Sequence, residues 1–217
     1  MDAAVARLIT GRLLSRPWPC YTPPMTWHFD LISPVYDRLL PAPDPQLWME
    51  LLRLPAGRLL DAGGGTGRVA WELRRLCRQV VVADFSHRML LQARDKEGLQ
   101  PVQADVARLP FPDHRFDRAL VADALHHFPD QRGAMAELLR VLAPGGRLVI
   151  EEPDLTRLPV KAVALAEKAV LMRSHFLSAE GICTLAQSCG GRASIGRRGK
   201  FLVWIIVDKP GGGESAA

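Results

Sequence analysis

Short apolar segments of strand length alternate with segments of helical periodicity along most of this chain, and that alternation limits the folds it can adopt. A helix between two strands brings the chain back to begin the next strand in the same direction, which produces a parallel sheet with helices on both faces. We expect strands at residues 58–61, 79–83, 99–104, 116–122, 147–151, 192–195 and 200–208. We expect helices at residues 68–78, 86–95, 129–142, 160–176 and 178–188.

The predicted fold class is therefore α/β, with a doubly wound, mostly parallel seven-stranded sheet. Residues 79–83 are almost continuously apolar, which is typical of a strand whose two faces are both covered by helices. The segment Pro144-Gly145-Gly146 is expected to end one helix before the fifth strand. The turn residues 196–199 separate the last two strands by a spacing that suits a hairpin, so the sheet should end in an antiparallel C-terminal hairpin.

The two ends of the chain differ in composition from its centre. Residues 1–24 contain one acid and several prolines, which indicates a disordered tail, an extension upstream of a true start at Met25, or a targeting segment. Residues 25–210 are expected to form one domain, because a chain of 217 residues with 48% hydrophobic content can bury a substantial core. Residues 211–217 are expected to form a flexible tail.

Cysteine spacing, hydropathy and charge argue against several classes of protein. The four cysteines show neither CxxC pairing nor metal-ligand spacing, so we expect reduced thiols, no metal site and a cytoplasmic location. No apolar run reaches the roughly 18 residues that cross a bilayer, so any contact with a membrane should be peripheral. The net charge of +5 comes from scattered arginines, which favours a solvated basic surface over nucleic-acid binding.

The most informative segment is Leu59-Leu60-Asp61-Ala62-Gly63-Gly64-Gly65-Thr66-Gly67, which joins the first expected strand to the first expected helix. Open α/β sheets bind ligands beyond the carboxyl ends of their strands, where this loop must lie. Glycines at 63, 65 and 67 allow the backbone to approach a ligand closely and to adopt positive φ. Asp61 offers a carboxylate suited to the ammonium group of a ligand.

Two cofactor classes compete for this loop. Residues 65–70 formally satisfy the GxGxxG/A pattern, and Asp84 follows Gly65 by 19 residues, so the fingerprint of a nicotinamide dehydrogenase is nominally met. Asp61 weighs against it, because a carboxylate at the start of the loop would repel a pyrophosphate and attract an amino-acid ammonium group. Charge complementarity therefore favours S-adenosylmethionine, and an NAD-binding dehydrogenase is the alternative.

Acids at the ends of the next two expected strands agree with this assignment. Asp84 can accept hydrogen bonds from both ribose hydroxyls, a role that an acid also has in dehydrogenases. Asp105 could accept a hydrogen bond from the adenine amino group, and a third acid at this place is not part of the dinucleotide fingerprint.

Five segments in order, DAGGGTG, VVVADFS, QADVARLPFPDHRFD, VADALHHFPD and ELLRVLAPGGRLVIEEP, resemble the successive motifs of class I S-adenosylmethionine-dependent methyltransferases. They cover about residues 57–153. LHHFPD and RVLAPGGRLVI resemble the small-molecule branch that includes the ubiquinone and menaquinone biosynthesis C-methyltransferases. Residues 29–32 and Tyr36-Asp37 resemble the N-terminal segment of that branch, whereas residues 155–190 show no clear match.

The resemblance implies a Rossmann-like methyltransferase fold for residues 25–210 and a role for each matching position. Asp61, Gly63, Gly65 and Gly67 would hold the methionine end of the cofactor, and Asp84 would bind its ribose. Phe85 and Met89 would flank the adenine, with Asp105 and Val106 at its edge. Ala122 and Asp123 would lie beside the sulfonium.

The sequence is less informative about catalysis and the methyl acceptor. His126 is the candidate general base, with packing of its ring against the fold as the alternative, and Tyr36, Glu152 and His175 are further candidates near the acceptor. Residues 122–125 lack the Asn/Asp-Pro-Pro-aromatic motif of DNA amino-methylation and the cysteine of pyrimidine C5 methylation. We therefore expect a small-molecule acceptor, such as a quinol or another aromatic or lipid-like compound. A cofactor-binding protein without turnover is the remaining alternative, and the oligomeric state is not specified.

Overall fold

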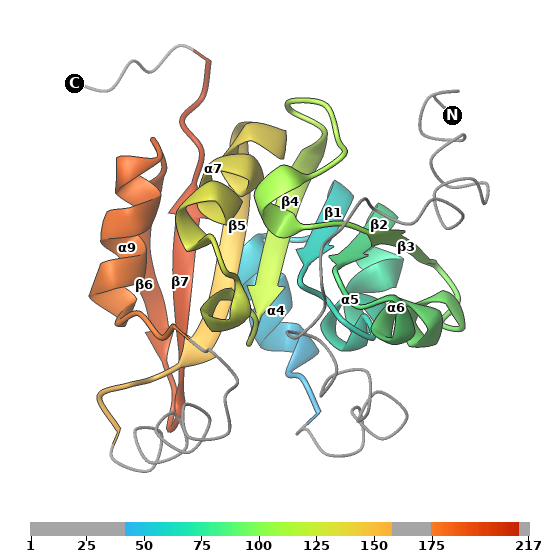
Figure 1. Cartoon of the computed structure of the whole chain (residues 1–217), viewed down its shortest axis with the longest axis horizontal. Coiled ribbons are helices and arrows are strands. Elements are labelled where there is room, and N and C mark those ends of the chain that lie inside the picture. Colours follow the sequence, from blue (N-terminus) through green and yellow to red (C-terminus); the bar gives the residue numbers. More distant parts are fainter. Residues whose placement is uncertain (1–41, 158–174, 213–217) are drawn as a thin grey trace.

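The computed structural model describes residues 42–157 and 175–212, which form a seven-stranded sheet of order β3-β2-β1-β4-β5-β7-β6 (Figure 1). Its strands are β1 Ala56–Ala62, β2 Cys77–Asp84, β3 Leu99–Gln103, β4 Phe116–Ala122, β5 Leu142–Pro153, β6 Arg192–Arg198 and β7 Leu202–Asp208. The first five strands pair in parallel, and β7 runs antiparallel between β5 and β6. The predicted α/β class, mostly parallel sheet and antiparallel C-terminal hairpin are confirmed.

Helices cover both faces of the sheet. The described α-helices are α4 Pro45–Leu52, α5 Arg68–Leu73, α6 His87–Arg94, α7 Gln131–Val141 and α9 Ala179–Ser188, and the 3-10 turns are η1 Arg74–Leu76, η2 Val106–Arg108 and η3 Leu125–His127. The apolar residues of α4, α5 and α6 pack in one core layer, which we call the α5 layer. Those of α7 and α9 pack in the other, the α7 layer.

Successive residues of the central strands contribute to opposite layers. In β1, Leu59 packs in the α5 layer and Leu60 in the α7 layer, and in β5 Val149 and Ile150 divide in the same way. Side chains alternate with a period of two along a strand, so this division continues to the polar residues at the strand ends. Asp61 therefore lies on the side of the α5 layer.

Several expected boundaries were wrong, and each error has a local cause. The helix expected at 68–78 stops at Leu73, continues as η1, and gives way at Cys77 to β2, where pairing with Ala56 of β1 begins. The helix expected at 160–176 lies outside the described residues except for 175 and 176, which are not helical. Helix α4 was not expected, although Asp44 accepts a hydrogen bond from the Leu47 amide and Pro45 occupies the first turn.

Two glycine-rich segments that the sequence analysis predicts to connect secondary-structure elements lie within strands. The C-terminal turn falls at residues 199–201, not 196–199, and Gly196 lies in β6 at a shift of register. A Cβ on Gly196 would come within 2.6 Å of Ile206, so close packing explains this glycine. Pro144-Gly145-Gly146 lies inside β5, where the Gly145 amide donates to the Lys209 carbonyl.

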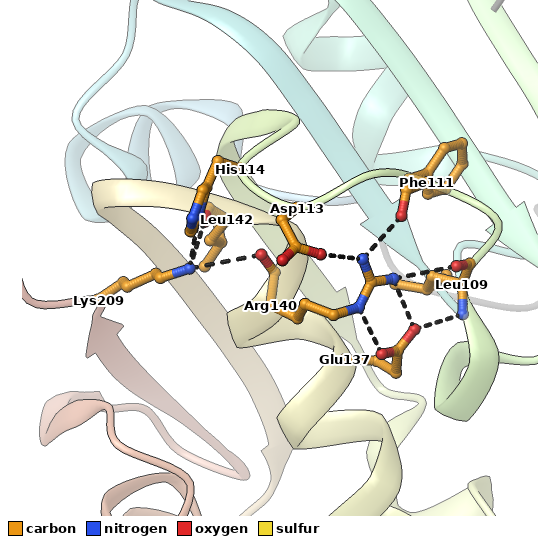
Figure 2. A network of polar contacts seen from close by, with 8 residues as sticks. All are labelled: Leu109, Phe111, Asp113, His114, Glu137, Arg140, Leu142 and Lys209. Carbon is orange, nitrogen blue, oxygen red and sulfur yellow. Dashed lines mark hydrogen bonds and ion pairs between the residues drawn. The ribbon is translucent and has the colours of Figure 1, made fainter. Parts of the chain in front are cut away.

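A polar network holds the chain between η2 and β4 against α7 (Figure 2). The Arg140 guanidinium donates to the carbonyls of Leu109 and Phe111 at 3.1 and 2.9 Å, and it pairs with Asp113 at 2.7 Å and Glu137 at 2.6 Å. Glu137 also accepts from the Leu109 amide at 2.9 Å. The network fixes the segment that follows the carboxyl end of β3.

Candidate active site

The carboxyl ends of β1, β2 and β4 meet at one edge of the sheet, where three aspartates are gathered. Asp61 ends the central strand β1, with Val82 of β2 on one side and Leu120 of β4 on the other. Asp84 ends β2, and Asp123 follows the last residue of β4. A parallel sheet brings these strand ends together, so residues far apart in sequence share one site.

Asp61 is a buried carboxyl group without a complete set of partners. The residue is 1% exposed, and its Oδ1 atom has no hydrogen-bond partner in the described part of the chain. Burial, with repulsion from Asp84, raises the pKa of Asp61 to about 7, although Arg68 and Lys96 act in the opposite direction. An orphaned carboxylate oxygen in a buried place is costly unless a ligand supplies a donor.

The glycines of the loop serve two different purposes. Gly63, Gly65 and Gly67 all have positive φ, of 67°, 55° and 71°. A Cβ on Gly67 would lie 2.5 Å from Leu99, and one on Gly63 would lie 2.9 Å from the Phe128 ring, so packing within the protein excludes side chains there. At Gly65 the nearest atom of the described residues would be Asp84 Oδ2, 4.0 Å away. Among these three glycines, only Gly65 leaves room for a side chain or a ligand within the described part of the chain.

Asp84 holds the loop and begins the adjoining turn. Its Oδ2 accepts from the Gly65 amide at 2.8 Å, and its Oδ1 accepts from the Ser86 amide at 2.7 Å. A carboxylate has about four acceptor sites, so these bonds are compatible with further hydrogen bonds to ribose hydroxyls. Beside it, Phe85 is 42% exposed, a large exposed fraction for an aromatic side chain, whereas Met89 is buried.

The next strand end is tied to Asp84 through the backbone. The Ala104 amide donates to the Asp84 carbonyl at 2.9 Å, which holds the end of β3 beside that of β2. Asp105 caps η2 by accepting from the Ala107 amide at 2.9 Å, and Val106 is buried. One oxygen of Asp105 thus has a structural role.

Asp123 has an unusual backbone conformation at the end of β4. Its φ is 53°, and its amide donates to the Glu151 carbonyl of β5 at 2.9 Å. Burial raises the pKa of the Asp123 carboxyl; His126 favours its charged form, and Glu152 disfavours it. A non-glycine residue held at positive φ stores backbone strain, which is common at functional sites. Ala122 precedes it and is half-buried.

His126 is held on the other side of the sheet end, in the α7 layer. Its Nδ1 lies 2.7 Å from Glu152 Oε2, and the Leu125 amide donates to Glu152 Oε1 at 2.8 Å. The His126 ring is 2% exposed and stacks on Phe176, with ring centroids 4.3 Å apart. His175 approaches through its backbone amide, which donates to the His126 carbonyl. These contacts are those of a buried, oriented imidazole.

The part of the chain that carries these strand ends is similar in sequence to known proteins. Residues 60–150 match the family model described as a methyltransferase domain. The chain is 40% identical over 122 residues to the ubiquinone/menaquinone biosynthesis C-methyltransferase UbiE of Pseudomonas putida, and 41% identical over 140 residues to the demethylmenaquinone methyltransferase of Thermus thermophilus.

The matches to these relatives are partial. They cover 49% and 57% of this chain, which spans 48% of the Pseudomonas protein and 63% of the Thermus protein. Among solved structures, a Thermotoga maritima methyltransferase described as a possible histamine N-methyltransferase aligns with a TM-score of 0.68 over 85% of this chain and 100% of its own. At 23% identity, that likeness supports the methyltransferase fold alone.

Two further residues, Arg68 and Trp204, contribute to this site, and sequence patterns did not single them out. Arg68, the first residue of α5, favours the charged forms of Asp61, Asp123 and Glu151, so one cation acts on three acids. Trp204 lies opposite Glu151 in the β5–β7 pairing. The position of Arg68 after the glycine loop could have pointed to it, whereas Trp204 becomes visible only through the register of β7.

Some residues named in the sequence analysis lie outside the described ranges. These are residues 29–32, Tyr36 and Asp37, and also the 1–24 extension and residues 213–217 of the tail. Within 42–157 and 175–212, no group of three His, Cys, Asp or Glu side chains is arranged to hold a metal ion. No helix in these same ranges has the length and hydrophobicity to span a membrane.

Proposed function

We propose that the protein transfers a methyl group from S-adenosylmethionine to a small-molecule acceptor. The observation that carries this proposal is the buried carboxyl of Asp61, whose Oδ1 atom has no hydrogen-bond partner among the described residues. The ammonium group of the methionine moiety supplies both the missing donor and the opposite charge. A pyrophosphate supplies neither.

The remaining residues of the edge fit the rest of this cofactor. At Gly65 the described residues leave room for a ligand, and Gly63 and Gly67 shape the loop for the methionine end. Asp84 is assigned to the ribose hydroxyls. The exposed ring of Phe85 offers a face for adenine, with Met89, Asp105 and Val106 around the same strand ends, and Ala122 and Asp123 are assigned to the sulfonium side.

The protein contributes mainly by positioning the reacting groups. When bound, the cofactor supplies an activated methyl group, so residues at the site need chiefly to align the nucleophile with it. Alignment of two reacting groups can account for about 7–11 kcal/mol of barrier reduction. His126 is the candidate for proton transfer that the sequence suggests, and its burial, its hydrogen bond to Glu152 and its stacking on Phe176 favour a positioning role.

The names of the relatives support a proposal for the class of methyl acceptor. Their names assign them to C-methylation in ubiquinone and menaquinone biosynthesis, and this chain spans about half the length of the first of them. We therefore propose a quinol-like aromatic acceptor. Residues 25–210 are proposed as the domain, with reduced thiols at Cys77, Cys183 and Cys189 that suit the cytoplasm. We propose neither a nucleic-acid partner nor an oligomeric state.

Two measurements test this function. Isothermal titration calorimetry with S-adenosylhomocysteine and with NAD should show binding of the first and none of the second; binding of NAD alone would replace the proposal with a dehydrogenase. Transfer of labelled methyl to a panel of quinols and phenols should then be detectable. Binding without transfer to any member would favour a cofactor-binding protein without turnover.

A further inference from the structure

Two neighbouring glutamates at the end of β5 have opposite surroundings. Glu152 lies on the side of the α7 layer and has a hydrogen-bond partner for each oxygen, the Leu125 amide and His126 Nδ1. Glu151 lies on the side of the α5 layer, the side of Asp61, and none of the described residues makes a hydrogen bond of good geometry to its carboxyl group. It is nevertheless only 8% exposed.

Trp204 of β7 lies beside Glu151 on the same face of the sheet. The two residues are directly opposite in the antiparallel pairing, so their side chains project to the same side. Trp204 is 8% exposed, and its buried Nε1 atom has no hydrogen-bond partner of good geometry among the described residues. A weak hydrogen bond from the indole favours the carboxylate form of Glu151, but its geometry is too poor to satisfy the buried N–H.

This pair adjoins the edge proposed to hold the sulfonium. The Glu151 carbonyl accepts from the Asp123 amide, which fixes the end of β5 next to that of β4. The charged groups that act on Glu151 are Asp123, which follows β4, Arg68 from α5 and Glu152 from its own strand. Burial and the Asp123 charge together raise the pKa of Glu151 to about 7.

An unsatisfied donor beside an unsatisfied acceptor selects a particular ligand group. A hydroxyl can accept from the indole N–H and donate to the carboxylate at the same time. A protonated amine could pair with the carboxylate, but it has no lone pair for the indole. Buried polar groups without partners are unfavourable, so the pair discriminates strongly in favour of the group that satisfies both.

We propose that Glu151 and Trp204 bind a hydroxyl group on the methyl acceptor, and that Glu151 removes its proton during transfer. This inference rests on the proposed methyltransferase function. The hydroxyl proton passes to Glu151 as the nucleophilic atom bonds to the methyl carbon, and the electron pair of the broken carbon–sulfur bond goes to sulfur. If the nucleophile is a ring carbon conjugated with the hydroxyl, that carbon then releases its own proton to solvent, and the oxygen regains a proton from Glu151.

The binding experiment uses the full chain saturated with S-adenosylhomocysteine under argon. The probes are 1,4-naphthohydroquinone, kept reduced with dithionite, and 1,4-dimethoxynaphthalene, which lacks the hydroxyl protons. The wild type should bind the hydroquinone at least about tenfold more tightly. Glu151→Leu should abolish this preference and Trp204→Phe should reduce it. Glu50→Gln, at an exposed residue of α4, is the matched control and should leave it unchanged.

Single-turnover methyl transfer to the hydroquinone separates binding from proton removal. Glu151→Gln keeps an acceptor oxygen, so its affinity for the hydroquinone should change less than about fivefold, whereas the transfer rate should fall about 10²- to 10⁴-fold. The wild-type rate should rise as the pH increases through about 7, because the base must be ionised, and Glu151→Gln should lack this dependence.

The outcomes distinguish the two proposals. All variants should bind S-adenosylhomocysteine within twofold of the wild type. A wild type that does not bind this compound contradicts the methyltransferase function itself. A wild type that binds it but does not prefer the hydroquinone, or a Glu151→Leu variant that keeps the preference, overturns the hydroxyl site alone. An unchanged transfer rate in Glu151→Gln removes the role of Glu151 as a base.

Discussion

Replacement of Asp61 by Asn should weaken cofactor binding and, at the same time, stabilise the protein without cofactor. The substitution keeps the size of the side chain and removes its charge. Because the carboxyl is 1% exposed and one oxygen has no partner among the described residues, its charge is costly until a cation arrives. The two effects therefore have one cause and opposite signs.

The loss of binding can be estimated from the burial of the pair. Removal of one partner from a buried, hydrogen-bonded charge pair costs about 2–5 kcal/mol, which corresponds to a decrease of about 30-fold to 4,000-fold in affinity for S-adenosylhomocysteine. With a pKa of about 7, the wild-type carboxyl must also lose a proton when it binds an ammonium group at lower pH. Wild-type affinity should therefore fall about tenfold from pH 8 to pH 6, and that of Asp61→Asn should not change with pH.

The gain in stability has a definite pH window. The pKa of Asp61 rises from 3.8 to about 7 on folding, so between these values the folded protein holds a proton that the unfolded chain has lost. The free energy of unfolding without cofactor therefore falls as the pH rises through this window. The total decrease is at most about 4 kcal/mol and is complete above pH 7. A buried Asn amide costs about 1–3 kcal/mol itself, which leaves a net gain of about 1–3 kcal/mol at pH 8 and almost none at pH 5.

Calorimetric titration and thermal unfolding at pH 5, 6 and 8 measure both effects. Each kcal/mol should raise the melting temperature by about 2–4 °C. Asp44→Asn is the matched control, because Asn caps a helix as well as Asp does and this residue is exposed at the start of α4. Unchanged affinity in Asp61→Asn, or a variant that is less stable than the wild type at pH 8, would refute the electrostatic reasoning.

Three further predictions follow from the geometry. Gly65→Ala and Gly145→Ala both place a side chain at positive φ where no described residue lies within van der Waals contact, and each should cost about 1–2 kcal/mol of stability. Calorimetry should find at least about tenfold weaker S-adenosylhomocysteine binding for Gly65→Ala and no change for Gly145→Ala. Equal effects on binding would show that Gly65 is not part of the site. Arg140→Ala should lower the free energy of unfolding, measured in urea, by about 2–4 kcal/mol. Arg140→Lys should recover less than half of the lost stability, because one ammonium group cannot reproduce the contacts of the guanidinium. Full recovery of stability in Arg140→Lys would contradict this account of the network. Glu152→Ala should cost about 3–5 kcal/mol of stability through the loss of the buried pair with His126, and a loss under 1 kcal/mol would show that the pair contributes little.

Sequence patterns predicted the sheet well where both faces are buried. The apolar run of β2 divides between the two core layers as expected, and β4 begins and ends at the predicted residues, Phe116 and Ala122. Periodicity was less informative at the end of α5, because Leu76 continues the helical spacing while the chain has already tightened into η1. At Gly196, local composition indicated a turn, whereas the cause of the glycine is Ile206, on the neighbouring strand.

The same distinction applies to the site. Acids at strand ends could be placed from the sequence, because parallel topology dictates that Asp61, Asp84 and Asp123 meet at one edge. Contacts that depend on the register between strands could not be predicted from the sequence. Glu151 and Glu152 are chemically identical neighbours, and only the pairing of β5 with β7 and the position of His126 reveal their different surroundings.

The antiparallel course of β7 also determines what surrounds Glu151. Pro153, the last residue of β5, lies opposite Leu202, the first residue of β7, and the Asp154 amide donates to the Phe201 carbonyl at 2.7 Å. The segment between these points, which includes α9 and β6, is thus joined at its two ends close to Glu151. A change of length beside this hydrogen bond would alter the surroundings of Glu151 and leave the strand ends that carry Asp61 and Asp84 in place.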